Sequence, residues 1–452
     1  MKPIAKLLPV TAIMLCYSFC SSAQILKNIG NRAKQKAEQR ANQKVDNAID
    51  KGLDKAEGTG QKKDNTSNQN NNQGNNNNNN SQADNGNSQS GGDQNPRNGT
   101  VSVNFETYSK FDFVPGEKII VDDDFTQDAI GDFPGKWNTN SGGEIVTVNG
   151  QSGRWLMISK KGRFLPEYIG DLPENFTLQF NLMSNENFDF YSSGLELYFL
   201  TGGNDQKIFE DYFLTAQKRS GLKFYFHPVT PGNKASEVAV EAWESGQKFM
   251  NNEVITQQFN SHTGNKRVAV SIWRQKQRIR VYLNEEKVFD LPKAFAPDKK
   301  YSATLFQIKD NMTNEKDRYL INNIKFAIGA PDTRNKLITE GKFVTRGILF
   351  DVSSDKIKPE SYGVLKDIAG TLKENAGVKV KIIGHTDTDG NDADNLSLSK
   401  RRAESVKANL VKEFGIDESR IQTDGMGESQ PVDKNTTNEA KSNNRRVEFV
   451  RL

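Results

Sequence analysis

Short segments in which apolar and polar residues alternate fill the middle of this 452-residue chain, from about residue 118 to residue 330. They are rich in aromatic and β-branched side chains and are separated by Gly, Asn and Asp; examples are residues 176–183, 194–200, 222–229, 266–275, 278–291 and 319–329. Alternation with a period of two is typical of strands that bury one face. Many short strands without a long helix predict an all-β, two-sheet sandwich of the jelly-roll type over residues 118–330.

A different pattern runs from residue 336 to residue 452. The run VKVKII at residues 378–383 is typical of a strand with one buried face. Apolar residues then recur at positions 403, 406, 410 and 414, which predicts an amphipathic helix. We further expect a bridge at 331–345, an opening strand in RGILFDV (346–352), a helix over 359–375 and strands in RIQTDGMGES (420–429) and NRRVEFVRL (444–452). This order predicts an α/β domain with a mixed sheet and a ligand loop at the carboxyl end of a strand.

Two charged residues stand where this strand meets the helix. Asp387 follows the strand, and Arg402 borders the apolar stripe of the helix, whereas Arg401 points away from that stripe. We expect Ser399 to be the N-cap of this helix, which puts Arg402 at about the third helical position, where a cation opposes the helix dipole. Local rules are broken more often where a functional site requires it, so we take Asp387 and Arg402 as the candidate site.

Asp387 and Arg402 together suit a zwitterion. An arriving carboxylate would meet the guanidinium and the free N–H groups of the first helical turn, while Asp387 would receive an ammonium group. Each charge-assisted bond contributes roughly 1.5–3 kcal/mol, so we expect a selective site of moderate affinity. The alternative is that Asp387 and Arg402 pair with each other and only clamp the loop.

Several separate blocks in the last quarter of the chain resemble one known family. GHTD (384–387), Gly390, Asn395, LSLSKRRA (396–403), GMGESQPVDKN (425–435) and NNRRVEF (443–449) are similar to the OmpA-like peptidoglycan-binding domain, and FDVSSDKIKPES (350–361) resembles its opening strand and helix start. The resemblance implies that Asp387 and Arg402 grip the diaminopimelate of the peptidoglycan stem peptide, which presents a free amino-acid end. It also implies that Asn395 and Arg445 lie near the pocket.

The predicted sandwich carries weaker signals. The hairpin tip at residues 284–286 and the stretch VDDDFTQDAIGDFPGKW (121–137) resemble concanavalin-like jelly-roll sandwiches. Retaining glycosidases need two carboxylates roughly 5 Å apart, and Glu196, Glu210 and Asp211 do not form such a pair on one strand face. We expect the four tryptophans in the core, with a sugar-stacking platform as the alternative. A structural calcium ion at Asp122, Asp123 and Asp124 is a further alternative.

Three segments are predicted before residue 101. Residues 1–23 have the charged start, the short apolar run and the small residues of a secretory signal peptide, with cleavage before Gln24. Both cysteines lie in this leader, so we expect no disulfide in the mature chain; acylation of Cys20 is the alternative. Residues 24–57 predict a basic amphipathic helix, either solvated or in contact with a membrane surface or a coiled-coil partner. Residues 58–100, rich in Asn, Gln and Gly, predict a disordered linker.

Composition narrows the classes of function. The chain has 61 Lys and Arg residues against 57 Asp and Glu residues, and a net charge of +4 implies no nucleic-acid partner. With three histidines and no Ser/His/Asp or metal-ligand spacing, we expect neither a cofactor nor a catalytic set. The acidic cluster between Asp387 and Asp394 lacks the Gly and Glu spacing of a calcium-binding EF-hand loop.

We therefore predict an exported, non-enzymatic protein of the periplasm, associated with the outer membrane and the cell wall. Its last domain is expected to bind peptidoglycan and to anchor the sandwich there, while outer-membrane or other envelope proteins and a glycan for the sandwich remain open as partners. A wall-docked glycan-processing enzyme is one alternative, and it requires two facing carboxylates in an open groove of the sandwich. A glycan-binding lectin is the other, and it requires exposed tryptophans.

Overall fold

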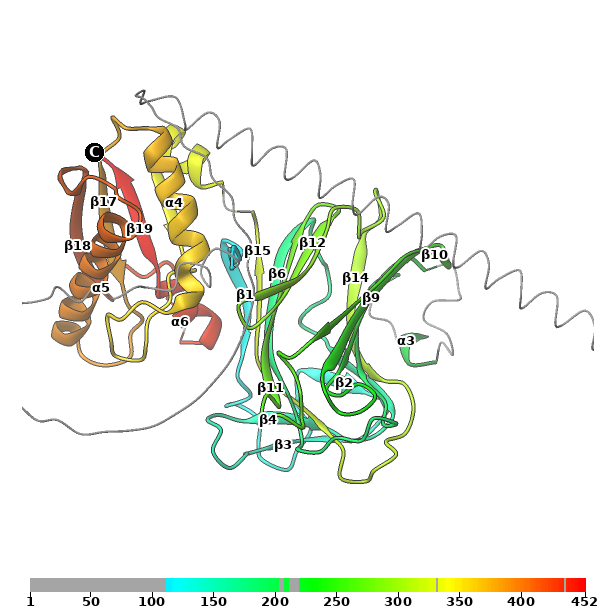
Figure 1. The fold of residues 1–452 in the computed structure, drawn as a ribbon. Coiled ribbons are helices and arrows are strands. Elements are labelled where there is room, and N and C mark those ends of the chain that lie inside the picture. Colours follow the sequence, from blue (N-terminus) through cyan, green and yellow to red (C-terminus); the bar gives the residue numbers. More distant parts are fainter. Residues whose placement is uncertain (1–110, 203–206, 211–218, 331, 435) are drawn as a thin grey trace, which may run out of the picture. The chain divides into compact units, whose positions relative to one another are not determined.

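The computed structural model describes residues 111–452, apart from 203–206, 211–218, 331 and 435 (Figure 1). All described residues belong to one compact unit that spans Asn98–Leu452. The expected leader (1–23), basic helix (24–57) and linker (58–100) lie outside the described residues and stay predictions. Among the described residues, no helix combines the length and the apolar character that a membrane crossing requires.

An eight-stranded antiparallel sheet forms one layer of the β-rich region. Its central strand β6 (Asn175–Ser184) pairs with β11 (Arg267–Gln275) on one side and with β15 (Tyr319–Ile328) on the other. The remaining strands, in chain order, are β1 (Lys118–Asp123), β3 (Gly143–Val146), β4 (Trp155–Ile158), β12 (Arg278–Leu283) and β13 (Glu286–Leu291). Asn284 adopts a positive φ of 53° in the tight turn between β12 and β13, as a hairpin at this position requires.

A seven-stranded antiparallel sheet forms the second layer. Its strand order is β10-β9-β8-β7-β14-β5-β2. The strands are β2 (Trp137–Thr139), β5 (Gly162–Pro166), β7 (Leu195–Thr201), β8 (Gly221–His227), β9 (Ser236–Glu244), β10 (Gln247–Thr256) and β14 (Tyr301–Ile308), and the short helix α3 (Lys207–Glu210) follows β7.

The two sheets bury their facing sides in one apolar core, which makes the region a β-sandwich. Phe176 and Phe180 of the first sheet meet Phe199, Phe226 and Phe306 of the second, with ring centroids 5.4 to 6.3 Å apart. The six strand segments expected from the alternating pattern are confirmed within a few residues. The jelly-roll class of the sandwich stays a prediction.

A four-stranded mixed sheet follows, in the order β16-β19-β17-β18. β17 (Val380–His385) runs parallel to β18 (Ile421–Gly427) and antiparallel to β19 (Val447–Arg451), which also pairs with β16 (Lys342–Thr345). The expected mixed α/β order is thus confirmed. One element was misplaced: the edge strand is β16, in the stretch expected as a bridge, and not RGILFDV. Phe343 explains the difference, because it is buried and faces Phe449 across β16 and β19.

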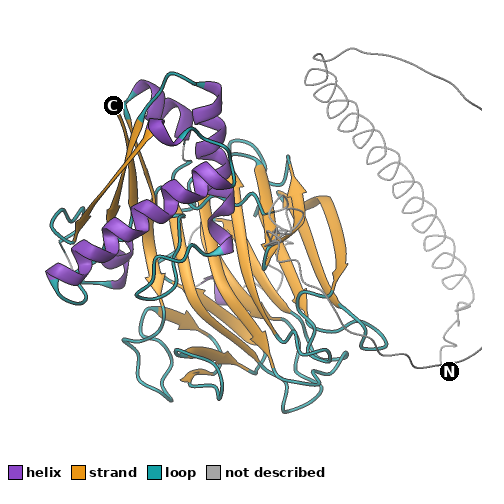
Figure 2. Ribbon diagram, turned by 60° about the vertical axis from the view of Figure 1, so that its left-hand side comes forward, coloured by secondary structure: helices purple, strands orange, loops and turns teal. Residues whose placement is uncertain are grey.

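Helices cover one face of this mixed sheet, as Figure 2 shows in purple against orange. The long helices are α4 (Tyr362–Glu374) and α5 (Asp392–Lys412), and the shorter ones are α6 (Asn438–Asn444), the π-helix η2 (Asn335–Thr339) and the 3₁₀ turns η3 (Pro359–Ser361) and η4 (Glu418–Arg420). Pro359 starts the first of the expected helices, and Ala403, Val406 and Leu410 of α5 are fully buried, as their spacing predicts.

Residues 111–117, which precede β1, contact both the sandwich and the mixed-sheet region. Phe113 packs on Tyr282 of the sandwich with ring centroids 5.6 Å apart, and both share an apolar cluster with Val364 of α4. A Cβ on Gly363 would lie 2.6 Å from the carbonyl oxygen of Phe113, so this close approach requires glycine. The two regions are therefore packed against each other through this segment.

Candidate functional site

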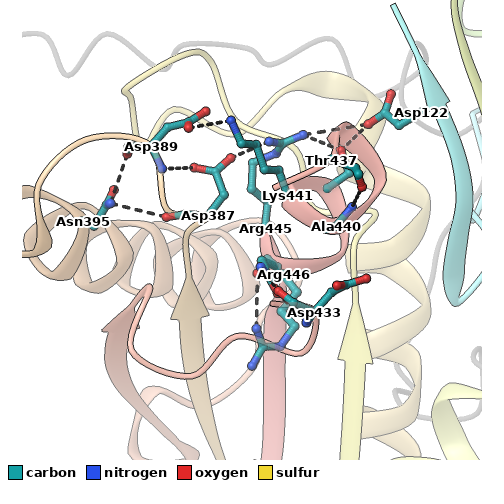
Figure 3. Close-up of polar contacts among 12 residues, drawn as sticks. Asp122, Asp387, Asp389, Asn395, Asp433, Thr437, Ala440, Lys441, Arg445 and Arg446 are labelled. Carbon is teal, nitrogen blue, oxygen red and sulfur yellow. Dashed lines mark hydrogen bonds and ion pairs between the residues drawn. The ribbon is translucent and has the colours of Figure 1, made fainter. Parts of the chain in front are cut away.

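The carboxylate of Asp387 lies just beyond the end of β17, at the carboxyl end of the strand where the ligand loop was expected. Its Oδ1 accepts a hydrogen bond from the backbone N–H of Asp389 at 3.2 Å, and its Oδ2 accepts one from Nη1 of Arg445 at 2.5 Å (Figure 3). The side chain is 12% exposed, so a partly desolvated anion remains reachable from outside. Charge–charge interactions in such a place are screened less than on an open surface.

Asn395 shapes the loop that carries Asp387. Its side-chain amide donates to the backbone oxygens of Asp387 and Asp389 at 3.3 and 3.1 Å, and to Oε2 of Glu428 at 2.5 Å. Because these acceptors engage its N–H groups and the residue is buried, Asn395 acts on the site by positioning the loop.

The start of α5 differs from the expectation. The N-cap is Asn391, whose side chain accepts from the backbone N–H of Asp394 at 2.9 Å, and acidic residues occupy the first turn. Ser399 is instead buried inside the helix, where its hydroxyl donates to the carbonyl of Leu396 and accepts from the N–H of Gly427. Counted from Asp392, Arg402 is the eleventh helical residue, about 15 Å along the axis from the first. The free N–H groups of the first turn therefore do not join Arg402 in one anion site.

Arg402 presents an open guanidinium fork. Its Nε donates to the carbonyl of Ser354 at 2.9 Å, and the guanidinium lies over the ring of Phe350, 4.8 Å from the centroid. Neither Nη1 nor Nη2 has a hydrogen-bond partner among the described residues. Burial lowers the pKa of Arg402 from its usual value, and the carboxylate of Asp387 opposes this shift while Arg445 adds to it. An arginine in this state stays charged at neutral pH and has two donors available for a carboxylate.

Asp387 pairs with Arg445 instead of with Arg402. Within the described residues, no ion pair joins Asp387 to Arg402, so the loop clamp considered from the sequence is not formed by these two residues. Arg445 directly follows α6 and donates to Ser442 as well as to Asp387. Its side chain is 45% exposed, so it borders the site from the solvent side. The structure thus brings Asp387, Arg402 and Arg445 together and places Asn395 behind the loop.

His385 is buried at the end of β17. Its backbone N–H donates to the carbonyl of Arg446, but neither ring nitrogen has a well-aligned hydrogen-bond partner in the described part of the chain. Nε2 lies 3.4 Å from Oε1 of Glu448. The same carboxylate contacts Arg446 through Oε1 and Lys342 through Oε2. Burial raises the pKa of Glu448, but its contacts with His385, Lys342 and Arg446 outweigh burial and hold the pKa well below its usual value. Glu448 is therefore an anion that Arg446 and Lys342 hold beside His385.

In the described part of the sandwich, the side chains considered for a sugar platform or a catalytic pair are enclosed. All four tryptophans are buried, and Trp273, the most accessible, is 8% exposed. Glu196 is 4% exposed and accepts from Tyr198 and Gln307 while it pairs with Lys223. Its carboxylate is thus satisfied by neighbours and does not face an open groove. The side chain of Glu210 and the whole of Asp211 lie outside the described residues.

Metal-binding groups are not assembled in the described part of the chain, where no three His, Cys, Asp or Glu side chains converge on one point. The three consecutive aspartates of the sandwich turn to different partners. Asp122 contacts Ser442, Asp123 accepts from Tyr168, and Asp124 accepts from Asn438. A calcium ion shared by these three aspartates is therefore not supported.

Sequence similarity identifies the region that holds this site. The sequence model of the OmpA family matches residues 349–445, which include Asp387, Asn395, Arg402 and Arg445. Residues 349–445 form an OmpA family domain.

Relatives of the OmpA domain come from several bacteria. Outer membrane porin F of Pseudomonas aeruginosa is 42% identical over 101 residues, which are 22% of this chain and 29% of the porin. Probable lipoprotein YiaD of Escherichia coli is 39% identical over 128 residues, 26% of this chain and 58% of that protein. The peptidoglycan-associated lipoprotein from Burkholderia pseudomallei aligns with a TM-score of 0.23 and 24% identity, over 27% of this chain and 98% of that chain. This chain spans less than two thirds of the length of either sequence relative.

Several residues that shape the OmpA domain's site were not singled out from the sequence. Phe350 and Ser354 stand in the block FDVSSDKIKPES, so their position in the family pattern was a usable signal. Glu428 likewise stands in GMGESQPVDKN. Asp122 of the sandwich was considered only for a calcium ion. No signal in the sequence predicts that it lies beside Arg445, which follows more than 300 residues later.

Proposed function

We propose that the OmpA domain binds peptidoglycan noncovalently by holding the free amino-acid end of diaminopimelate in the stem peptide. The observation that carries the proposal is the open fork of Arg402, which Ser354 and Phe350 fix close enough to the partly buried carboxylate of Asp387 for the two charges to interact. A cation with free donors beside a reachable anion is complementary to a carboxylate and an ammonium on one carbon.

Each charge of the ligand has a partner in this arrangement. The ligand carboxylate takes the two free terminal nitrogens of Arg402, and the ligand ammonium takes the carboxylate of Asp387. Arg445 lies at the same carboxylate and keeps it oriented, and Asn395 keeps the loop in place. With roughly 1.5–3 kcal/mol for each charge-assisted contact, two contacts give a moderate affinity that suits a reversible anchor.

The protein is then a non-catalytic component of the bacterial envelope that anchors its sandwich to the cell wall. The names of its relatives support this location, since they include an outer membrane porin and a lipoprotein. The wall is periplasmic, so the OmpA domain works in the periplasm after export. The lectin and enzyme alternatives for the sandwich lose support, because its tryptophans are buried and Glu196 is enclosed by its partners.

Co-sedimentation with purified, protein-free peptidoglycan tests this function. The mature chain (residues 24–452) is compared with Asp387→Asn and Arg402→Gln, which remove one charge each with little change in size. Arg401→Gln is the matched control, because Arg401 is the exposed neighbour and its guanidinium donates to Ser397 on the same helix. We expect the wild type and the control to pellet with the wall and both site variants to stay in solution. Equal pelleting of all four proteins would contradict the proposed site.

A further inference from the structure

We infer that the sandwich supplies one side of the wall-binding site, with Asp122 as the residue that positions Arg445. This inference rests on the proposed function and assigns the sandwich a part in ligand recognition. It concerns a residue outside the OmpA domain, at the end of the first strand of the sandwich.

Helix α6 of the OmpA domain is attached to strand β1 of the sandwich. The side chain of Asn443 accepts from the backbone N–H of Ile119 at 3.1 Å and donates to its carbonyl at 2.9 Å. Asn438 donates to Oδ1 of Asp124 at 2.9 Å. A buried side-chain amide that satisfies both polar groups of a strand residue fixes the helix against that strand. The residue that follows this helix, Arg445, is therefore fixed relative to β1.

Arg445 lies between two carboxylates, one from each region, as Figure 3 shows. Its Nη1 donates to Asp387, and its Nη2 lies 3.9 Å from Oδ2 of Asp122. Ser442 links the same groups, because it accepts from Arg445 and donates to Asp122. Asp122 is also paired with Lys325 at 3.3 Å, and its side chain is only 14% exposed. Asp122 therefore holds the Nη2 end of the guanidinium, mainly through Ser442, while the Nη1 end donates to Asp387.

A cavity of about 540 Å³ opens beside this chain of contacts. Its polar lining comes from both regions: Asp122, Gln179 and Ser271 from the sandwich, and Arg402, Lys441 and Arg445 from the OmpA domain. This space exceeds what one zwitterionic end group fills. A stem peptide bound at Asp387 and Arg402 would therefore continue along a wall made by the sandwich.

Asp122 matters for binding because it holds the guanidinium that orients Asp387. Arg445 donates to Asp387 from Nη1, and Asp122 holds the other end of the guanidinium through Ser442. Without the Asp122 charge, Arg445 can turn away and no longer keeps the carboxylate of Asp387 in the orientation that receives the ligand ammonium. Loss of the Asp122 charge should weaken ligand binding by about three- to tenfold, the size expected for residues coupled through a shared partner.

Calorimetric titration of the mature chain with the tripeptide L-Ala-γ-D-Glu-meso-diaminopimelate tests this inference. Asp122→Asn is compared with Asp123→Asn, a matched control on the same strand whose carboxylate turns to Tyr168 inside the sandwich. We expect three- to tenfold weaker binding for Asp122→Asn and unchanged binding for the control. On an Arg445→Gln background, Asp122→Asn should have no further effect, because its influence passes through Arg445; a merely structural role would persist there.

A second variant guards against misfolding of the first. Ser442→Ala removes the hydroxyl link and keeps every charge, and we expect a smaller loss in the same direction. If Asp122→Asn binds as tightly as the wild type, the role of Asp122 is overturned while the proposed function stands. The same follows if Asp122→Asn weakens binding as much on the Arg445→Gln background as in the wild type. Failure of the wild type to bind, with Asp387→Asn indistinguishable from it, would overturn the proposed function and this inference with it.

Discussion

At the scale of single residues, the geometry around Arg402 favours an arginine for the proposed binding site. The guanidinium is planar, so it can lie on the ring of Phe350, donate from Nε to Ser354 and still direct two parallel N–H groups at a carboxylate. A lysine has one charged nitrogen on a flexible stem and cannot do all three. We therefore expect the selectivity of the proposed site to depend on the shape of this cation as well as on its charge.

Arg402→Lys tests that dependence. We expect the variant to bind the diaminopimelate tripeptide roughly tenfold more weakly, because the charge remains while the fork and the ring contact are lost. Calorimetric titration measures the change, and Arg401→Lys, at the exposed neighbouring position, serves as the control. Unchanged affinity in Arg402→Lys would mean that the site detects only a positive charge.

Glu448 makes the stability of the OmpA domain change with pH in the acid range. Its pKa is lower in the folded chain than the usual value of 4.5, so its contribution to stability is present above pH 4.5 and is lost as the pH falls through its folded pKa. Below pH 4.5, the free energy of unfolding should fall more steeply for the wild type than for Glu448→Gln. Denaturant titrations at a series of pH values measure this slope, and parallel curves for the two proteins would contradict the assignment.

At the scale of elements, alternation and helical spacing were enough to predict most of the fold. β17 and the buried stripe of α5 follow from VKVKII and from Ala403, Val406 and Leu410, because burial on one face determines both patterns. The predicted start of α5 at Ser399 was wrong. Ser399 and Asn391 are both good N-cap residues, and only the packing of the folded chain shows that Ser399 is buried inside the helix. The pairing of Asp387 with Arg445, 58 residues later, depends on how α6 packs and has no local signature.

Asn391→Ala tests the observed start of α5. Its side chain caps the helix through Asp394, so we expect a loss of about 1 kcal/mol in the free energy of unfolding. Lys400→Ala, at an exposed position inside the helix, should change stability by less than about 0.5 kcal/mol. Denaturant unfolding followed by circular dichroism measures both. No effect of Asn391→Ala would indicate that the helix does not depend on this cap.

At the scale of the whole described molecule, the sandwich and the OmpA domain share an apolar cluster built on residues 111–117. Phe113 contributes to this cluster, and its backbone meets Gly363 of α4 without room for a side chain. All four tryptophans belong to the sandwich, whereas the long helices of the described residues 111–452 belong to the OmpA domain. Tryptophan fluorescence and helical circular dichroism therefore report on different regions.

We expect the two signals to change together during denaturant unfolding, because the shared cluster couples the regions. Gly363→Ala should shift the transition to lower denaturant, since its Cβ would come within 2.6 Å of Phe113. Gly370→Ala in the same helix is the matched control, because nothing lies within 4 Å of its Cβ, and it should be neutral or slightly stabilising. Separate fluorescence and dichroism transitions in the wild type would contradict the coupling.

Asp387 and Arg402 are proposed to recognise an ammonium and a carboxylate on one carbon. The most direct test of this recognition is a calorimetric titration of the mature chain with two tripeptides that differ only in this group: one ends in meso-diaminopimelate and the other in L-lysine, which keeps the ammonium but lacks the carboxylate. We predict that the diaminopimelate peptide binds roughly ten- to hundredfold more tightly and that Arg402→Gln abolishes this preference. Equal binding of the two peptides, or a preference that survives in Arg402→Gln, would contradict the account.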